Sequence, residues 1–437
     1  MLAYYLELGF RSLRSSRGLT VLMLLSIAMG VAACMTTLTV FHALSSDPIP
    51  EKSSQLFNVQ LDDQLMRDFK PNDEPDLQLT RFDAETLLRE KRGVHQVMMT
   101  GGNIAVDPAG SGKNDSPPFF ARSRYTTADF FGMFNTPFLY GSGWSAADDE
   151  AKARVAVISR ELNEQLFGGA DSRGKILRLR DKDLTIVGVL NDWRPAPHYF
   201  DVTLGAYAKP ADLYVPIQTS FDLKFGRSGN MDCWGNSPGG DSLALAAPCS
   251  WLQYWVQLDT PQQLKDYRDY LVHYAEAQKA AGRFERPPNA RVRPVMEWLD
   301  VQKVIPNDTR LQVLLAFGFL IVCLTNAVGL LLAKCLRRSS EIGVRRALGA
   351  PRSAIFMQFL IEAGSLGLAG GALGLVLTWI GLWLVRQGPS SYAQLAQLDF
   401  EMLATTLMLA VVSSLAAGLL PAWRACQVTP ALQLKAQ

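Results

Sequence analysis

The stretch KCLRRSSEIGVRRALGAPRSAIFMQFLIEAGSLGLAGGALG, from Lys334 to Gly374, lies between two long apolar runs and decides the membrane topology of the chain. Its first half combines one acidic residue, Glu341, with a dense group of basic residues. These are Lys334, Arg337, Arg338, Arg345, Arg346 and Arg352. Because loops retained in the cytoplasm carry an excess of Lys and Arg, we predict that 334–353 is a cytoplasmic loop between two membrane spans.

Four apolar segments are long enough to cross about 30 Å of hydrocarbon as helices. The predicted spans are 18–44, 310–333, 354–386 and 400–423. The first follows a basic flank, as a signal peptide does, but it exceeds the about 7–15 apolar residues of such peptides, so we interpret it as a retained span. The loop 387–399 has no Lys or Arg, whereas the tail 424–437 is basic. The positive-inside rule then predicts that both termini are cytoplasmic and that 387–399 is a short periplasmic loop.

Acidic residues are concentrated between the first and second spans. Of the 41 Asp and Glu residues, five lie outside 45–308, namely Glu7, Glu341, Glu362, Asp399 and Glu401. This distribution predicts a large soluble domain at 45–309, outside the cytoplasm. A net charge of +2 offers no basic face of the kind that nucleic-acid binding requires.

The domain at 45–309 alternates between strand and helix patterns. Strands are predicted at 56–61, 94–100, 155–159, 176–180, 184–192, 251–258 and 290–295, and helices at 82–93, 160–167 and 261–282. The segment 101–118 is rich in turn residues and is predicted to be a loop. The fold class is therefore an α-helical membrane protein with four transmembrane helices and a large α+β extracytoplasmic domain inserted between helices 1 and 2. Within that domain we expect a β-α-β lobe formed by 55–124 and 251–300, with an outer lobe at roughly 125–250 inserted in it.

Residues 1–17 carry apolar side chains every three to four positions. These are Leu2, Leu6, Phe10 and Leu13, with arginines on other faces. The pattern predicts an amphipathic helix lying on the inner leaflet. A plain N-terminal extension of the first span is the alternative.

Small residues recur at helical spacing in two of the spans. They are Ser26, Gly30 and Cys34 in the first, and Gly367, Gly370, Gly371 and Gly374 in the third. Such residues let helices approach closely, and we expect packing within the chain rather than dimerisation. Glu362 lies in the third apolar segment, where an ionisable residue suggests a function. We favour a structural role in which it meets an arginine of the basic loop.

No catalytic or metal-binding pattern is present in the sequence. Residues 109–113, AGSGK, resemble part of a phosphate-binding loop, but the positions that need Gly and Ser or Thr are Asp107 and Asn114. We predict that the chain is not an enzyme and holds neither cofactor nor metal. Cys233 and Cys249 lie in the soluble domain and can form a disulfide if that domain is outside the cytoplasm; two unpaired thiols are the alternative.

The segment EIGVRRALGAPRSAIFMQFLIEA (341–363), followed by a glycine-rich span, resembles the permease subunits of the MacB/FtsX-like ABC transporter superfamily. The segments 125–145, 155–169 and 184–192 look like the periplasmic domain of MacB-type permeases. The tail 416–435 is similar to the ending of the family, although Gln427-Val428-Thr429 is less charged than expected. The segment 226–250, which contains both soluble-domain cysteines, has no counterpart in the family that we can identify.

The resemblance implies a permease dimer, homomeric or heteromeric, in the bacterial inner membrane with ABC ATPase subunits on its cytoplasmic face. Some members carry a fused ATPase; since this chain starts at the amphipathic helix, we expect a separate ATPase partner that binds ATP and Mg. The loop 334–353 would be the coupling element. Its docking residues would be Arg337, Arg338, Glu341, Gly343, Arg345, Arg346, Gly349 and Arg352. The alternative for this loop is a surface helix whose arginines meet lipid phosphates.

In this family, ATP-driven closure is transmitted through the spans to the periplasmic domain, which is called mechanotransmission. The resemblance therefore implies efflux of a peptide, antibiotic or other amphiphile, together with a periplasmic adaptor and an outer-membrane channel. A lipoprotein-release permease is one alternative. A regulator of a periplasmic cell-wall hydrolase, which transports nothing, is another.

Overall fold

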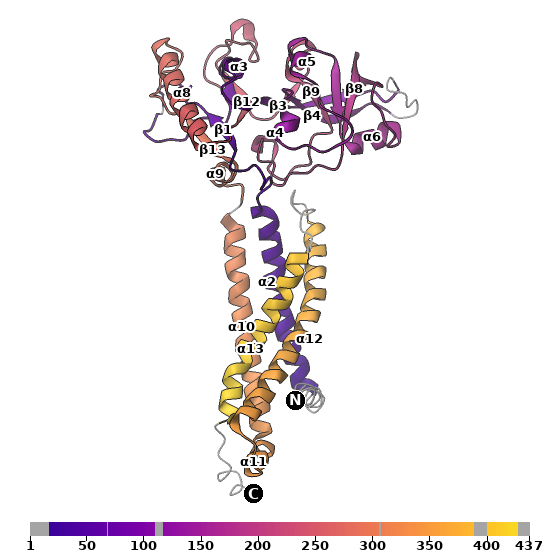
Figure 1. Ribbon diagram of the computed structural model, residues 1–437, viewed down its shortest axis with the longest axis vertical. Coiled ribbons are helices and arrows are strands. Elements are labelled where there is room, and N and C mark those ends of the chain that lie inside the picture. The colour runs from indigo at the N-terminus through magenta and orange to yellow at the C-terminus, as the bar shows by residue number, and fades with distance from the viewer. Residues whose placement is uncertain (1–16, 68, 110–116, 306, 389–399, 427–437) are drawn as a thin grey trace. The chain divides into compact units, whose positions relative to one another are not determined.

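The computed structural model describes residues 17–67, 69–109, 117–305, 307–388 and 400–426. The chain divides into two compact units. One comprises Asp47–Val304, and the other comprises Met1–Ser46 together with Ile305–Gln437. Figure 1 shows a mixed sheet with helices in the first unit and long helices in the second.

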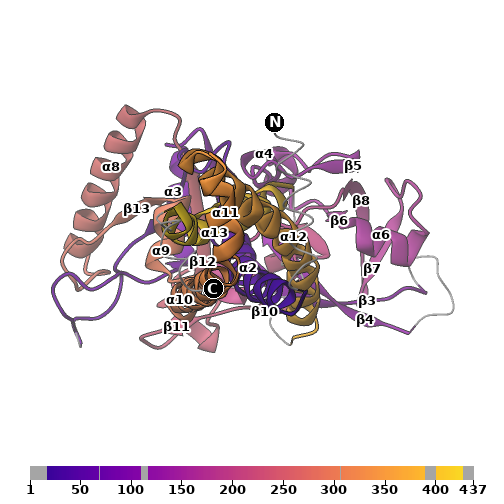
Figure 2. The ribbon, with the colours of Figure 1, turned by 90° about the horizontal axis from the view of Figure 1, so that it is seen from below.

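Four helices of the described residues are long and apolar enough to span a membrane. They are α2 (Arg17–Ser45), α10 (Asn307–Arg337), α12 (Arg352–Arg386) and α13 (Phe400–Cys426), and a short helix α11 (Ser339–Ala347) connects α10 to α12. Helix α12 packs against both α2 and α13, and α2 also packs against α10 (Figure 2). The predicted helix at 1–17, the loop at 387–399 and the tail at 424–437 lie mostly outside the described residues.

The soluble unit is built around one mixed sheet. Its main strand order is β13-β1-β12-β3-β4-β9-β6-β8-β5. These strands are β1 (Leu56–Gln60), β3 (His95–Val106), β4 (Phe119–Thr126), β5 (Phe138–Gly141), β6 (Val155–Ile158), β8 (Lys182–Leu190), β9 (Leu213–Pro216), β12 (Cys249–Gln257) and β13 (Arg291–Pro294). Short strands β2 (Leu79–Thr80), β7 (Ile176–Leu179), β10 (Arg227–Ser228) and β11 (Asp232–Cys233) pair beside this path.

Helices lie between the strands along the chain. They are α3 (Arg81–Glu90), α4 (Phe130–Met133), α5 (Ala146–Glu150), α6 (Arg160–Phe167), α7 (Ile217–Asp222), α8 (Pro261–Ala280) and α9 (Val295–Val301), with short 3-10 turns at Val202–Leu204 and Pro238–Gly240. Helix α8 begins with a capping box, in which Thr260 and Gln263 exchange hydrogen bonds with each other's backbone N–H groups. Four transmembrane helices and an inserted α+β domain confirm the predicted fold class.

Two apolar cores cover the two faces of the sheet. Along β12, Tyr254 and Val256 contribute to one core, whereas Trp255 between them contributes to the other. This alternation follows from the period of two in a strand. In the second core, the Phe130 ring makes edge-to-face contacts with Phe134 and Phe200 at centroid distances of 5.0 and 5.6 Å. Because β12 is buried on both faces, apolar residues occur at consecutive positions in it, at 251–252 and 254–256.

The prediction of a loop at 101–118 is wrong for its first part. Strand β3 continues through Gly101 and Gly102 to Val106 and pairs with β4 along this length. A Cβ atom on Gly102 would collide with the ring of Tyr125 on the neighbouring strand. The two glycines therefore allow close packing across the sheet rather than a turn. Residues 110–116 lie outside the described part of the chain.

The two expected lobes share this sheet. Strand β4 pairs with β9, which links the strands of 55–124 and 251–300 to those of 125–250. The division into lobes at these boundaries stays a prediction.

Candidate functional site

Helix α11 is the core of the candidate coupling site. One side of it is buried: Ile342 packs with Cys335 of α10 and with Ile355 and Phe359 of α12. This apolar contact fixes α11 between the ends of two long helices. A displacement of α11 therefore has to move α10 or α12 as well.

The side of α11 that faces away from Ile342 is exposed and partly apolar. Val344 and Leu348, one helical turn apart, are 54% and 83% exposed. Arg337 and Arg352, at the neighbouring ends of α10 and α12, are also exposed. We name Val344, Leu348 and Arg352 the α11 face. An apolar pair bordered by arginines is typical of the centre of a protein interface.

The charged residues of α11 are engaged with one another. The Glu341 carboxylate accepts hydrogen bonds from Arg338 Nε at 3.1 Å and from Arg345 Nη2 at 2.6 Å. Arg345 Nη1 also donates to Gln358 Oε1 of α12 at 3.2 Å. Of the residues that the sequence suggested for docking, Glu341 thus pairs with Arg338 and Arg345 close by in the chain, and Arg345 also joins α11 to α12. Arg346, the remaining arginine of the helix, is half-buried.

The glycines of the coupling segment have separate roles. Gly349 has a φ of +96°, a backbone conformation that favours glycine, and its N–H donates to the Arg346 carbonyl at 3.1 Å. It ends α11 and lets the chain turn into α12, which begins after Pro351. Gly343 is buried.

A buried ion pair lies directly behind α11. Lys334 Nζ of α10 donates to the Glu362 carboxylate of α12, and the two side chains are 3% and 1% exposed. Arg338 Nη1 lies 3.7 Å from the second oxygen of Glu362. The sequence suggested that Glu362 meets an arginine of the loop, but its nearer partner is Lys334. The sequence does show a charged residue in or beside each of two apolar segments, Lys334 and Glu362, but it does not show that they pair.

The small residues of the spans lie at helix contacts within the chain. A Cβ on Gly30 would lie 2.9 Å from Cys323 Cβ of α10, and Ser26 Oγ donates to the Cys323 carbonyl at 2.9 Å. Cys34 is buried in the same helix bundle. These contacts hold α2 against α10.

The glycines of α12 lie at its contacts with two neighbouring helices, α2 and α13. A Cβ on Gly370 would lie 3.0 Å from Ile27, and one on Gly374 would lie 3.3 Å from Val31, both on α2. Gly367 and Gly371 face α13, where added Cβ atoms would collide with Ser414 and approach Ala410. All four predicted glycines therefore allow close intrachain packing, with α12 between α2 and α13.

In the soluble unit, Cys233 and Cys249 form a disulfide. It joins β11 to β12 and closes the segment between them, where the Trp234 N–H also donates to the Pro248 carbonyl at 3.1 Å. Among the described residues, no group of three or more His, Cys, Asp or Glu side chains is placed to hold a metal ion.

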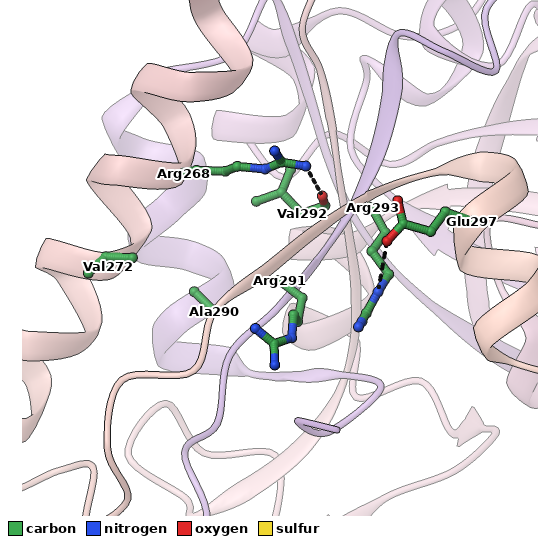
Figure 3. A pocket seen from close by; sticks show the side chains of 7 residues that line it. All are labelled: Arg268, Val272, Ala290, Arg291, Val292, Arg293 and Glu297. Atoms are coloured by element: carbon green, nitrogen blue, oxygen red, sulfur yellow. Dashed lines mark hydrogen bonds and ion pairs between the residues drawn. The ribbon is translucent and has the colours of Figure 1, made fainter. Parts of the chain in front are cut away.

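An opening of about 450 Å³ lies between α8 and β13, the strand at one edge of the sheet (Figure 3). Arg268 donates to the Val292 carbonyl at 3.2 Å. Arg293 pairs with Glu297 at 3.4 Å and with Glu74 at 2.8 Å. These contacts hold the edge strand and compensate the charge of Arg293, so we assign them a structural role.

Comparison with known proteins identifies the family. A profile of the MacB-like periplasmic core domain matches residues 20–274, and a profile of the FtsX-like permease C-terminal region matches 313–430. The pyoverdine export ATP-binding/permease protein PvdT of Pseudomonas aeruginosa is 22% identical over 98% of this chain and 58% of its own length. The macrolide export ATP-binding/permease protein MacB of Escherichia coli K12 is 23% identical over 96% of this chain and 58% of its own.

The chain thus spans 58% of the length of these curated relatives. Among solved structures, the periplasmic region of MacB from Actinobacillus actinomycetemcomitans shows 12% identity and a TM-score of 0.37, covering 59% of this chain and 96% of that one. The extracellular domain of the transporter YknZ shows 13% identity and a TM-score of 0.34, covering 55% and 99%. Because the periplasmic-core profile alone covers more than half of the chain, this protein belongs to the MacB/FtsX-like family of ABC transporter permeases.

Proposed function

We propose that this permease couples ATP hydrolysis by an ABC ATPase partner to movement of its extracytoplasmic domain, and that the partner docks on the α11 face. The observation that carries the proposal is that α11 has one buried side and one exposed, partly apolar side. Ile342 fixes one side to α10 and α12, whereas Val344 and Leu348 on the other side are exposed in the part of the chain that the structure describes. ATP and Mg are bound by the ATPase, and the permease chain itself performs no catalysis.

The helix contacts support transmission away from α11. Helix α12 is continuous from Arg352 to Arg386 and packs through Gly370 and Gly374 against α2. The soluble unit is connected to the membrane unit at both of its ends, through α2 and α10, which pack on each other at Gly30. A shift of α12 therefore acts on the pair of helices that carries the soluble unit. The permease works as a dimer in this proposal.

Export is the favoured outcome of this movement. The relatives at 22% and 23% identity are named for export of pyoverdine and macrolides. We propose that this chain exports a peptide, antibiotic or other amphiphile with a periplasmic adaptor and an outer-membrane channel. The basic residues of 334–353 support a location in the inner membrane with both termini cytoplasmic. Lipoprotein release and regulation of a cell-wall hydrolase remain alternatives that the cargo and partners distinguish.

Docking is tested by expressing the tagged full-length chain with each ABC ATPase of the same genome and measuring co-purification. Leu348→Asp places a charge on the α11 face and should weaken the complex by about 2 kcal/mol or more, roughly 30-fold. Leu139→Asp, at an exposed leucine of the soluble unit, is the matched control. Arg352→Glu should also weaken binding, whereas Arg386→Glu at the other end of α12 should not.

Two results would contradict the proposal. Either no ATPase co-purifies with the wild-type chain, or an ATPase binds the Leu348→Asp and wild-type chains equally. Charge reversal at Arg345 is a less specific test, because it also breaks the contacts of that side chain with Glu341 and Gln358.

A further inference from the structure

A pocket of about 270 Å³ in the soluble unit is walled on one side by the segment between the two bonded cysteines, Cys233 and Cys249. Trp234, Leu245 and Pro248 of this segment form one side of it. The Cys233–Cys249 disulfide anchors both ends of the segment to β12, and Arg81 Nη1 of α3 donates to the Leu243 carbonyl at 3.0 Å. The wall is therefore held in place before any ligand arrives, which favours binding.

The opposite side of the pocket contains a buried carboxylate. Asp63, shortly after β1, lines the pocket and is 2% exposed. Neither of its oxygens accepts a hydrogen bond from another described residue. Burying a charged group without a partner is strongly unfavourable, and buried polar groups are almost always paired. An unpaired carboxylate at a pocket is the arrangement expected of a group that awaits a ligand.

The surroundings of Asp63 are negative. Arg283 also lines the pocket and acts to lower the pKa of Asp63, but its guanidinium is hydrogen-bonded to Asp83, with Nη1 at 2.8 Å and Nη2 at 2.9 Å from the two carboxylate oxygens. Asp76 accepts hydrogen bonds from neutral donors, among them Ser250 Oγ at 2.6 Å and Gln64 Nε2 at 2.8 Å. Burial, followed by the charges of Asp83 and Asp76, raises the pKa of Asp63 well above its ordinary value. A cation bound beside Asp63 would relieve this repulsion.

The other residues that line the pocket include apolar side chains, which can contact the apolar part of an organic cation. Trp234 and Phe82 present aromatic rings to the pocket, and Leu245 presents an aliphatic side chain. Aromatic faces attract cations, and the Arg283 guanidinium already lies 4.0 Å from the centroid of Phe82. A volume of about 270 Å³ admits a small alkyl group with one charged head.

We propose that this pocket binds an alkylammonium group, with Asp63 as the counter-ion and Trp234 and Leu245 contacting the alkyl chain. The group belongs either to a small free amine or to the side chain of a lysine residue. This inference goes beyond the proposed function and does not depend on ATPase docking or on export, since binding is measured without ATP.

The experiment titrates the full-length protein in nanodiscs with butylammonium and with Nα-acetyl-lysine amide, using ligand-observed NMR at pH 7.5. Butanol and Nα-acetyl-norleucine amide are the uncharged counterparts. The charged probes should bind and the uncharged ones should not. Binding of butylammonium alone assigns the site to a free amine, and binding of the lysine amide assigns it to a lysine side chain.

Variants separate a binding role from a structural one. Asp63→Asn should weaken binding about 10-fold or more, because it removes a charged hydrogen-bond partner. Because burial raises the pKa of Asp63 and so favours its neutral form when no cation is bound, the neutral Asn should leave the melting temperature of the ligand-free protein unchanged. Trp234→Ala should weaken binding about 3- to 30-fold, because the alkyl chain loses the apolar surface of the indole. Asp266→Asn, an exposed carboxylate on α8, is the matched control and should have no effect.

Three results would overturn the proposal. Neither charged probe binds the wild-type protein, or the uncharged probes bind equally well, or Asp63→Asn binds with wild-type affinity. A lower melting temperature of Asp63→Asn together with unchanged binding would assign Asp63 to the structure of the domain.

Discussion

The Lys334–Glu362 pair is predicted to be the most sensitive polar contact of the membrane unit. Both side chains are almost fully buried, at 3% and 1% exposure. Glu362→Ala leaves the Lys334 ammonium without its carboxylate in an apolar bundle. Removing one partner of a buried ion pair costs about 3–5 kcal/mol. The neighbouring Arg338, 3.7 Å from the same carboxylate, loses its contact as well, which places the effect toward the upper end.

Replacing both charges distinguishes the pair from its separate residues. In Lys334→Met/Glu362→Met, no buried charge remains, and two apolar side chains of similar length occupy the space. Because well-packed apolar replacements of buried ion pairs are often neutral or stabilising, the double variant should recover most of the lost stability. Together with the single variants Lys334→Met and Glu362→Met, the double variant completes a cycle that gives the coupling energy of the pair.

The assay is thermal unfolding of the detergent-solubilised protein, followed by loss of the monodisperse peak in size-exclusion chromatography. Expected melting temperatures are lowest for Glu362→Ala and near wild type for the double variant. Glu341→Ala, whose partners are exposed or half-exposed, is the matched control and should change stability by less than about 1 kcal/mol. A Glu362→Ala protein as stable as the control would refute the burial argument.

Three other perturbations have effects that follow from the structure. Gly418→Ala should destabilise the bundle by about 1–3 kcal/mol, because its Cβ would collide with Ala363, whereas Gly318→Ala, with nothing within 4 Å, should be neutral in thermal unfolding. Cys233→Ser opens the disulfide and should cost about 2–4 kcal/mol, read by the same assay with and without reductant. Burial lowers the pKa of His198 to about 4, with Arg124 contributing, so its unfolded form takes up a proton that the native form excludes. Stability that is complete above pH 6.5 should therefore fall by up to about 3 kcal/mol as the pH decreases to 4, and His198→Gln should remove this part of the pH profile.

Each of these expectations has a contrary outcome. Equal melting temperatures for Gly418→Ala and Gly318→Ala would show that the α12–α13 contact is looser than described. Identical melting of the wild-type and Cys233→Ser proteins under oxidising conditions would contradict a stabilising disulfide. A pH profile that His198→Gln leaves unchanged would assign the acid sensitivity to other groups.

Local patterns predicted the elements of this protein well. The apolar runs of the spans correspond to α2, α10, α12 and α13, and the helix predicted at 261–282 corresponds to α8. These features depend on residues close together in the chain, so the sequence without a structure is sufficient to predict them. The glycine pair Gly101-Gly102 failed as a turn signal, because the side chain that explains it, Tyr125, comes from another strand.

The candidate coupling site likewise has features that the sequence predicted and features that only the structure revealed. Composition pointed to the basic segment 334–353, but the structure assigned Arg345 and Glu341 to contacts that hold α11, and left Val344 and Leu348 exposed. The sequence showed arginines as the prominent feature. Which of these arginines pair within the chain depends on residues of α12 such as Gln358, which lies beside α11 only in the folded protein.

By itself, the sequence determined the four spans, the place of the soluble domain between the first two, and the basic segment that joins the second to the third. Hydropathy and charge are additive along the chain, and the membrane responds to them segment by segment. Only the tertiary structure decided that Lys334 meets Glu362, and that Asp63 lies unpaired beside Trp234. The physical reason is that burial and pairing are properties of a neighbourhood, and these neighbours are separated in sequence by 28 residues in the first case and by most of the soluble domain in the second.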